Sequence, residues 1–458
     1  MLLPAFVGGQ TLGDVFTQKI YDHYDAKFPR ASDYTNVVYI NPEFTGSPDG
    51  TIERPYRYLH DAPQTSNTAY LLKRGTTYTK DDGHYTFRVS NILVGAYGTG
   101  DRPQIVAPPG ASGGIQFYGD DSHIRDIEVS YVRYGQHKDE AHNGIIFNVK
   151  MRSAWIWGIN IRFIGCEISG ASNNGIFVQQ KTLDQDNFFE FGYGHVHKIN
   201  QRWTPTTGQE IAWGDGIQIS EFRGHYHIHN SIIDKSDTGN KFTIIVNVLD
   251  NGINSVKGII ENNYLFGPMP QPDGGSIVYL ENPSGATSAN HHTAIVRNNI
   301  MVGSSYDGVK HTGAAIYANG ATFKAFDNFI YWCHNDFVHV GTNRGTNEVS
   351  GNTFIEIGED ADIPGYEPGE PEPDPEPDPE PDIKYEFLEG QQVRLIAIPD
   401  EGWEFVRWIG IESTDNPVII QMSEDISVTA VFEREGELAK YILIVNVEGE
   451  GQVLIEAL

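Results

Sequence analysis

A short motif, in which an asparagine is followed two positions later by an apolar residue, recurs through the second half of the chain. It occurs at Asn230, Asn262, Asn298, Asn328 and Asn352, with spacings of 24 to 36 residues. Repeats of this length are typical of stacked supersecondary units, each too small to bury its own apolar face. The sequence therefore predicts a solenoid, which offers a long outer surface rather than one pocket.

A second series, in which a small or polar residue precedes an apolar one, interleaves with the first. Its members are Gly114-Ile115, Gly144-Ile145, Gly175-Ile176, Gly216-Ile217, Thr243-Ile244, Ser276-Ile277, Ala315-Ile316 and Asp336-Phe337. Frequent valine, isoleucine, phenylalanine and tyrosine favour strands over helices. Two strand series with one drifting period predict an all-β coil whose strands stack in parallel. We interpret the recurring asparagines as structural, with stacked side chains that hydrogen-bond to one another and to turn backbone.

The termini differ from the repetitive body, and we expect four segments. Residues 1–36 form an N-terminal cap segment, residues 37–358 the coil, residues 359–383 an acidic proline-rich linker, and residues 384–458 a small β module. Apolar residues at helical spacing, with Thr11 and Asp14 as a capping box, predict a helix over 11–28. This helix is expected to cover the open end of the first rung of the coil. Residues 181–214 and 266–274 break the rhythm and are expected to project as loops.

Charge is distributed unevenly along the chain. The net charge is −29, but residues 359–458 hold 26 acidic and 5 basic residues, a balance of −21, which leaves about −8 for the rest. Without a basic stripe to neutralise phosphates, a nucleic-acid partner is disfavoured. No stretch approaches the roughly 18 apolar residues of a membrane span. The apolar start at Met1–Val7 is too short for a secretory signal, so we expect a removed signal, another export route or carriage on a virus particle.

The opening of the body resembles a known superfamily. The segments Tyr39–Asn41, Gly46–Thr51, Leu71–Tyr78 and Val94–Gly98 are similar to the start of right-handed parallel β-helix proteins of the pectate-lyase-like superfamily. The resemblance implies that fold. It leaves activity open, because the superfamily holds polysaccharide lyases, glycoside hydrolases, phage tailspikes and proteins without known catalysis.

The C-terminal module resembles the internalin-type B-repeats of bacterial surface proteins. The resemblance rests on Gly402–Trp408, Asn416-Pro417 and Val428–Phe432. The usual opening strands of such a module follow it here, at 441–453, instead of preceding it. Residues 440–458 therefore resemble the start of a further repeat. Alternatively, this segment folds back, or crosses to a neighbouring molecule, to complete the first module.

Alternation along the strands indicates which side chains face outward, since successive residues point to opposite faces. The densest outward polar cluster is expected beside Ile217 and Ile219. The candidate catalytic residues are Lys181, Asp215, Glu221 and Arg223, with Asp215 and Glu221 also as ligands of a possible calcium ion. The candidate substrate-binding residues are Gln179, Gln218, Trp203, Tyr193 and His227, of which Trp203 and Tyr193 are expected to stack on sugar rings.

Two reactions suit this cluster. Lysis of a uronic-acid polymer needs a base such as Lys181 or Arg223 and a cation that neutralises the substrate carboxylate. Hydrolysis needs two carboxylates about 5 to 9.5 Å apart. Asp215 and Glu221 are six residues apart, roughly 20 Å along an extended strand, so each would need a partner from another rung. The alternative for Asp215 is a turn residue, matched to Asn143 and Asn174 on earlier rungs.

Histidines form two further clusters. His225, His227 and His229 alternate with Tyr226 and Ile228, so all three are expected to face outward, as candidate metal ligands or bases. Same-face neighbours lie about 6.8 Å apart, which hinders ligation of one ion by all three. A polar loop carries the second cluster, His137, Asp139, Glu140 and His142. The two cysteines, Cys166 and Cys333, lie beside apolar strands and are expected to be buried thiols.

These features together predict an extracellular β-helix protein that acts on or binds a polysaccharide or cell-surface glycan, with a polysaccharide lyase-like activity as the first hypothesis. The alternative is a non-catalytic adhesin or a phage virion appendage, similar to a receptor-binding tailspike. In that case the coil is a rigid rod with a recognition face. An oligomer is compatible with both.

Overall fold

The computed structural model describes most of the coil and parts of the C-terminal module. The described residues are 11–79, 84–106, 114–135, 141–179, 187–199, 214–222, 224–236, 242–248, 256–268, 275–282, 292–303, 305–306, 310–340, 347–355, 392–395, 397, 403–411, 413–421, 427–434 and 437–446. The chain forms two compact units, Met1–Gly365 and Tyr366–Leu458. The expected linker 359–383 lies outside the described residues.

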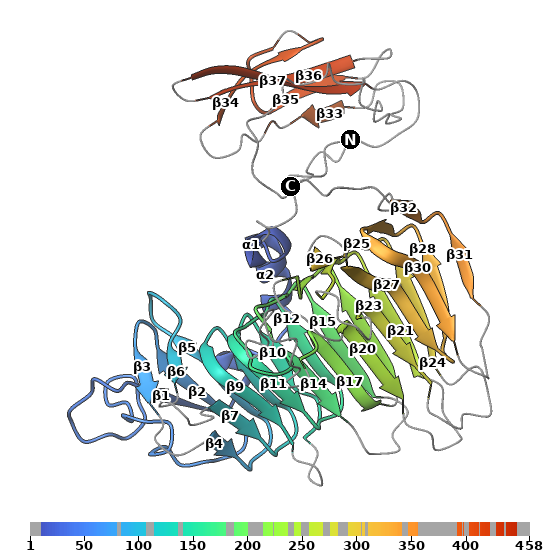
Figure 1. The fold of residues 1–458 in the computed structure, drawn as a ribbon. Helices are drawn as coiled ribbons and strands as arrows, with labels where there is room; N and C mark the ends of the chain where they lie inside the picture. The colour runs from blue at the N-terminus through green and yellow to red at the C-terminus, as the bar shows by residue number, and fades with distance from the viewer. Residues whose placement is uncertain are drawn as a thin grey trace. The chain divides into compact units, whose positions relative to one another are not determined.

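The first unit is a parallel β-helix, as the sequence predicts, and its strands stack side by side along the coil (Figure 1). One flank, sheet A, has twelve strands. They are β1 (Asn36–Ile40), β2 (Thr68–Lys73), β5 (Ile92–Tyr97), β8 (Ser122–Arg125), β10 (Ile145–Phe147), β12 (Ile161–Ile164), β15 (Phe188–Gly192), β18 (His225–His229), β21 (Val256–Glu261), β24 (His292–Arg297), β28 (Thr322–Phe326) and β31 (Glu348–Ser350).

Two further ladders of parallel strands complete each turn of the coil. The short ladder holds β3 (Thr77–Thr79), β6 (Gln104–Val106), β9 (Glu128–Tyr134), β11 (Lys150–Ile156), β13 (Glu167–Ser169), β16 (His195–His197), β19 (Ile232–Asp234), β22 (Tyr264–Phe266), β25 (Ile300–Val302), β29 (Phe329–Tyr331) and β32 (Thr353–Ile355). The long ladder holds β4 (His84–Phe87), β7 (Gly114–Phe117), β14 (Ile176–Gln179), β17 (Ile217–Phe222), β20 (Phe242–Val248), β23 (Ser276–Glu281), β27 (Lys310–Asn319) and β30 (Cys333–Val340). Strands β9 and β11 run through both ladders, and β26 (Ser305–Tyr306) pairs antiparallel with β27.

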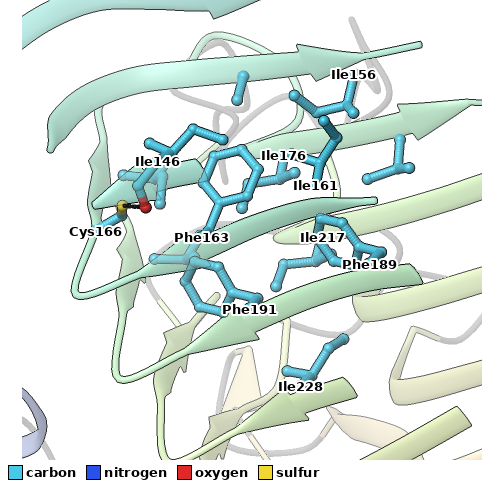
Figure 2. Close-up of a cluster of buried hydrophobic side chains, with 14 of the residues drawn as sticks. Ile146, Ile156, Ile161, Phe163, Cys166, Ile176, Phe189, Phe191, Ile217 and Ile228 are labelled. Atoms are coloured by element: carbon cyan, nitrogen blue, oxygen red, sulfur yellow. Dashed lines mark hydrogen bonds between the residues drawn. The ribbon is translucent and has the colours of Figure 1, made fainter. Parts of the chain in front are cut away.

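Apolar side chains from all three ladders fill the inside of the coil. Phe163, Phe189 and Phe191 from sheet A meet Ile176 and Ile217 from the long ladder, and all five are fully buried (Figure 2). In the long ladder, Ile176, Ile217 and Ile244 pair in register, so like side chains stack from rung to rung. This continuous core confirms that one repeat cannot bury its own apolar face.

The recurring asparagines are structural, as predicted, but the motif mixes two turn positions. Asn328 and Asn352 are stacked, whereas Asn230, Asn262 and Asn298 each precede the stacked position by one residue. Asn263, Asn299, Asn328 and Asn352 form a ladder in which each Nδ2 donates to the next Oδ1 at 2.9 to 3.0 Å. Just before the stacked position, Asn262, Asn298 and Asp327 have φ between 53° and 56°, and Asn230, which precedes Ser231 on an earlier rung, has a φ of 49°. Asparagine and aspartate tolerate this left-handed conformation better than most residues, so they recur there.

The second sequence series mixes two ladders. Gly144-Ile145 opens a strand of sheet A, whereas Gly175-Ile176 and Gly216-Ile217 belong to the long ladder. At Ser276-Ile277 the series is one residue out of step, because Val278 rather than Ile277 pairs with Ile244. Small residues precede both kinds of strand, so residue type alone does not separate them.

The N-terminal helix exists, but it is broken and packs elsewhere than expected. It consists of α1 (Leu12–Val15) and α2 (Gln18–Asp25), and a 3-10 turn, η2 (Ala31–Asp33), follows. Phe16, Tyr21 and Phe28 pack against Phe147 of β10. The helices therefore lie against the middle of the coil wall, and the prediction that they cover the end of the first rung is wrong. Their aromatic residues find an apolar patch on sheet A.

Residues 181–214 are not one projecting loop. Within this stretch, β15 (Phe188–Gly192) and β16 (His195–His197) pair with both neighbouring rungs. The aromatic run Phe188-Phe189-Glu190-Phe191 alternates only over a few residues, which hid the strand in the sequence pattern. Both predicted buried thiols are confirmed, and burial raises the pKa of Cys166 and of Cys333 to about 12.

The described residues of the second unit form two antiparallel sheets. Strand β33 (Gln392–Leu395) pairs with β35 (Val418–Gln421), and β34 (Trp403–Ile409) pairs with β36 (Ser427–Arg434). Strand β37 (Glu437–Asn446) pairs with β36 along most of its length. The segment after the B-repeat-like stretch therefore folds back onto the module over 437–446, as the fold-back alternative predicts.

Candidate functional site

The outward face of the long ladder carries most of the predicted site residues that the structure describes. In β17, Ile217 and Ile219 are buried inside, while Gln218 and Glu221 are half-buried on the outer face. Gln179 ends the neighbouring strand β14, where Val178 faces the core. The alternation inferred from the sequence is thus correct for these strands.

Asp215 lies in the turn before β17 and is fully buried. Its backbone N–H donates to Asn174 Oδ1 at 2.9 Å, and its Oδ1 accepts from the backbone N–H of Phe242 at 3.1 Å. The fully buried ammonium of Lys235 donates to the carbonyl of Gly214, the preceding residue. Asn174 and Asp215 therefore occupy the same turn position on neighbouring rungs, as the interpretation of Asp215 as a turn residue predicts. Asn143 belongs to a different turn, just before β10 of sheet A, where its Nδ2 donates to Asp121 Oδ1.

Glu221 sits at an irregularity of β17. Its φ is 50°, and the register between β17 and β20 shifts between Ile219 and Phe222. β-Bulges occur more often next to active sites than elsewhere in sheets, and they change the direction of a side chain. Gln179 Nε2 donates to Glu221 Oε2 at 2.9 Å, and Trp157 Nε1 donates to Gln179 Oε1 at 3.2 Å. A chain of three side chains therefore fixes this carboxylate on the outer face.

Aromatic rings flank the polar residues toward the N-terminal end of the coil. Trp155 lies 5.5 Å from Phe177 and 5.5 Å from Trp157, measured between ring centroids. The guanidinium carbon of Arg133 lies 5.3 to 5.8 Å from the rings of Trp157, Tyr131 and Trp155. Trp155 and Phe177 are paired in register, so their rings occupy neighbouring rungs.

A second aromatic group flanks the same residues toward the C-terminal end. Tyr279 stacks on Tyr317 at 5.4 Å with an interplanar angle of 11°, and it lies 4.4 Å from Phe242. Tyr279 and Tyr317 are in register on β23 and β27. Strand pairing places Gln218 and Ile245 between Phe177 and Tyr279, so the two aromatic groups belong to one row along the outer face of the long ladder.

Glu281 is a candidate residue that the sequence did not reveal. It is half-buried at the end of β23, and burial raises its pKa, while hydrogen bonds from Asn319 and Tyr279 act in the opposite direction. Asn319 Nδ2 donates to Glu281 Oε1 at 3.4 Å. The strand pattern Ser276–Glu281 does place Tyr279 and Glu281 on one face, but nothing in the sequence connects them with Glu221.

Strand register makes that connection. Asn247 of β20 pairs with Glu281 of β23, and the bulge of β17 places Glu221 beside Asn247, between the pairs Ile219–Val246 and Phe222–Val248. Glu221, Asn247 and Glu281 therefore form one row across three neighbouring strands, which we call the carboxylate row. Within the described part of the chain, Asn247 Oδ1 is buried and has no hydrogen-bond partner.

Other predicted site residues lie elsewhere. His227 belongs to β18 of sheet A, and Tyr193 follows β15 and lies 5.7 Å from Tyr24 of α2, so neither shares the face of Gln218. The grouping of these two with the long ladder is therefore wrong, because the chain turns between β17 and β18. Lys181, Trp203 and Arg223 lie outside the described residues, as do His137, Asp139 and Glu140.

The calcium ligands predicted at Asp215 and Glu221 do not meet. Asp215 is buried before the first residue of β17, and Glu221 is half-buried near its last residue. A calcium ion prefers six to eight oxygen ligands around it, so each carboxylate would need ligands from neighbouring rungs. Among the described residues, the group of three histidine, cysteine, aspartate or glutamate side chains spaced to hold a metal ion contains neither Asp215 nor Glu221, and the calcium ion stays a prediction.

The comparisons with known proteins concern the two units separately. Residues 383–436 match the family model of the divergent InlB B-repeat domain. Comparison with curated protein sequences finds no match. Among the described residues, no helix is long and apolar enough to cross a membrane.

Solved structures similar to the chain include a pectate lyase, a phage tailspike protein and an epimerase module. The pectate lyase Pel9A is 15% identical, with 70% of this chain and 82% of that chain covered and a TM-score of 0.38. A variant tailspike protein of E. coli bacteriophage HK620, in complex with a pentasaccharide, is 11% identical, with 64% and 55% covered and a TM-score of 0.38. The A-module of the Azotobacter vinelandii mannuronan C-5 epimerase AlgE6 is 12% identical, with 74% and 94% covered and a TM-score of 0.30. The strand pairing of this chain, rather than these likenesses, establishes its fold.

Proposed function

We propose that the outer face of the long ladder binds an extended polysaccharide and hydrolyses it, with Glu221 and Glu281 as the two catalytic carboxylates. The observation that carries this proposal is the carboxylate row, in which Glu221, Asn247 and Glu281 lie on successive strands. A solenoid face is open at both ends and suits a polymer that extends beyond the site.

The spacing of the row favours hydrolysis over other uses of two glutamates. Neighbouring strands lie about 4.8 Å apart, so the backbones at Glu221 and Glu281, two strands apart, are separated by roughly 10 Å. Inverting glycosidases hold their two carboxyl groups about 6.5 to 9.5 Å apart to leave room for a water molecule. Two flexible side chains on backbones at this distance span that range, and the expected outcome is inversion at the anomeric carbon.

The surroundings of the two carboxyl groups assign their roles. Burial raises the pKa of Glu281, which favours the protonated form that a general acid needs. Glu221 accepts a hydrogen bond from the Gln179 amide, which holds its carboxylate in one orientation. Glu281 then protonates the oxygen of the leaving sugar, and Glu221 takes a proton from the attacking water.

Binding is assigned to the two aromatic groups. Strand pairing places Trp155, Phe177, Tyr279 and Tyr317 in one row together with Gln218. The carboxylate row runs beside it, two residues further along β20 and β23, so a chain bound on the rings would pass alongside the carboxylates. Sugar rings present apolar C–H faces that pack on aromatic rings, while Gln218 and Asn319 offer amides to hydroxyl groups. The proposed substrate is extracellular, a cell-surface or secreted glycan.

A panel of acidic and neutral polysaccharides tests the proposal. Release of reducing ends, lost in E281Q and in E221Q with binding retained, supports hydrolysis at the carboxylate row. Unsaturated product detected by ultraviolet absorbance would instead support lysis, the first hypothesis from the sequence, with Lys181 or Arg223 as the base. Binding without any product would favour the adhesin or virion appendage. If the chain shows no binding and forms no product, a polysaccharide is not its ligand.

A further inference from the structure

The outer face of sheet A carries a row of charged side chains that the proposed hydrolysis does not use. Six residues contribute to it, in the order in which they cross the sheet from β12 to β24: Arg162, Glu190, His229, His227, Glu261 and Arg297. The two imidazoles stack at 4.1 Å between ring centroids. Each carboxylate bonds to one histidine on the inner side and one arginine on the outer side.

The contacts separate the two oxygens of each glutamate. Glu190 Oε1 lies 3.1 Å from His229 Nε2, while its Oε2 lies 3.4 Å from Arg162 Nε. Glu261 Oε1 lies 2.9 Å from His227 Nε2, while its Oε2 accepts from Arg297 Nε at 2.7 Å. The arginines thus orient the carboxylates and leave one oxygen of each directed at an imidazole nitrogen. Such outer partners are typical of metal ligands.

The position of the ring proton on His229 indicates a positive charge next to its other ring nitrogen. Its Nδ1 lies 3.0 Å from Asn230 Oδ1, so the ring proton belongs on Nδ1. Nε2 then turns a lone pair toward the Glu190 carboxylate, and two acceptors at 3.1 Å repel unless a positive charge lies between them. A ring proton on Nε2, or a metal ion in its place, would supply this charge.

The space around His229 is shaped for its ring. A Cβ at Gly192, on the neighbouring strand, would lie 2.5 Å from His229 Cε1 and Nε2, so glycine there admits the imidazole. Tyr193 meets the same ring edge-on at 5.3 Å. Glu190 and His229 are 9% and 6% exposed, which limits competition from water for any ion that they hold.

We propose that Glu190, His227 and His229 form a binding site for a divalent transition-metal ion such as Zn²⁺. One ligand atom from each of the three lies within 4.8 Å of the others. Bound Zn²⁺ keeps its nitrogen and oxygen ligands at about 2.0 to 2.2 Å, so closing the site requires movements of the order of 1 Å. Two imidazoles and one carboxylate suit zinc, copper or nickel and disfavour calcium or magnesium, which prefer oxygen ligands alone.

Metal binding has a defined proton balance at this site. The ion forms bonds to the imidazole nitrogens and to Glu190, and any proton held at those nitrogens is released to solvent. The ion would also join β15 to β18 across the sheet, because its ligands come from both strands. Glu261 lies close enough to His227 to become a fourth ligand or to stay an outer partner.

The chain contains its own control. His195 and His197 of β16 also stack at 4.1 Å, and His197 Nε2 lies 3.2 Å from Glu167 Oε1. Among the described residues this second pair does not belong to any cluster of three ligands with suitable spacing. A general affinity of stacked histidines for metal would therefore appear at both pairs, whereas the proposed site exists only at His227 and His229.

Calorimetric titration of the full chain, produced without a histidine tag, with Zn²⁺ tests the proposal. We expect one ion per chain, proton release seen as a dependence of the heat on buffer, and a rise in melting temperature. H229Q and E190Q should weaken binding about 100-fold or more, and Asn230→Gly, which removes an outer partner, about 10-fold or more. H197Q should bind like the wild type.

Two results would overturn the proposal. One is Zn²⁺ binding of equal affinity and stoichiometry in the wild type and H229Q, and the other is an equal loss in H197Q. Because H229Q alters a partly buried ring, circular dichroism must show that each variant keeps the wild-type spectrum. The Co²⁺ form provides a second measurement, since its visible absorption bands report nitrogen and oxygen ligands and should vanish in E190Q.

Discussion

The outer faces of the long ladder and of sheet A belong to the same coil but have opposite chemistry. On the long ladder, half-buried Glu221 and Glu281 have amide and phenol neighbours, and a row of aromatic rings runs beside them. On sheet A, Glu190 and Glu261 each contact a histidine and an arginine. Burial raises the pKa of Glu281, which suits proton exchange with a substrate, whereas carboxylates paired with histidine and arginine are suited to hold an ion. The difference shows that neighbours, rather than residue type, decide what a glutamate on such a coil can do.

A single turn separates the two faces. Glu221 and His227 are six residues apart, yet they point to different sides because the chain bends between β17 and β18. Gly224 in this bend has a φ of +113°, and a Cβ there would lie 2.2 Å from the carbonyl oxygen of Asn187. Only glycine fits that combination of backbone angle and close approach. The geometry of this turn therefore places Glu221 and His227 on different faces of the coil.

The largest expected effect would break the comparison at the long ladder. E281Q should reduce hydrolysis of the substrate about 10²- to 10⁴-fold, because a general acid contributes about that much and an amide cannot donate the proton. Substrate affinity should stay within about threefold. The control is E261Q on sheet A, which should leave the hydrolysis rate unchanged. An equal loss in both variants would mean that the two faces do not differ as proposed.

A second prediction concerns the coil that both faces share. N299A should lower the free energy of unfolding by about 3 kcal/mol, because the buried Asn299 amide bonds Ile260 O and Asn328 Oδ1 and accepts from Asn263. The neighbouring change N298G should cost less than about 1 kcal/mol, since Asn298 is exposed and has a φ of 54°. Urea unfolding of both variants measures the difference, and equal costs would refute the distinction between stacked and turn asparagines.

The recurring asparagines predict a coil of stacked rungs, although they occupy two neighbouring turn positions, and the resemblance of 39–98 to parallel β-helix proteins adds the particular fold. The carboxylate row was beyond the sequence. It depends on the bulge at Glu221 and on the pairing of Asn247 with Glu281, and strand register is not visible in one sequence. Glu190 was not among the candidates from the sequence, because its strand β15 lies within 181–214, which was predicted to be a loop.

A third prediction sharpens the comparison by its aromatic groups. W155A should weaken polysaccharide binding about tenfold, or about 1.4 kcal/mol, since the indole is a proposed platform for a sugar ring. Trp332 is 39% exposed in the turn before β30 and serves as a matched control. W332A should bind like the wild type. Affinity electrophoresis in a gel that contains the substrate polysaccharide measures both, and a comparable loss in W332A would remove the assignment of Trp155.

The smallest expected effect concerns a carboxylate of the sheet-A type that lies on the short ladder. A hydrogen bond with His197 is the main reason that the pKa of Glu167 falls from 4.5 to about 2. Because the ionised form is favoured in the folded state, this stabilisation is complete above pH 4.5 and is lost as the pH falls toward 2. The side chain is partly exposed, so solvent screening limits the contribution to about 1 kcal/mol or less.

E167Q should therefore reduce the loss of stability between these pH values in urea unfolding. E128Q, in which the altered residue accepts from Gln104 instead of a histidine, should keep the wild-type acid sensitivity. If E167Q and wild type lose stability equally, pairing with histidine does not set the behaviour of such carboxylates, and the contrast drawn between the two outer faces loses its electrostatic basis.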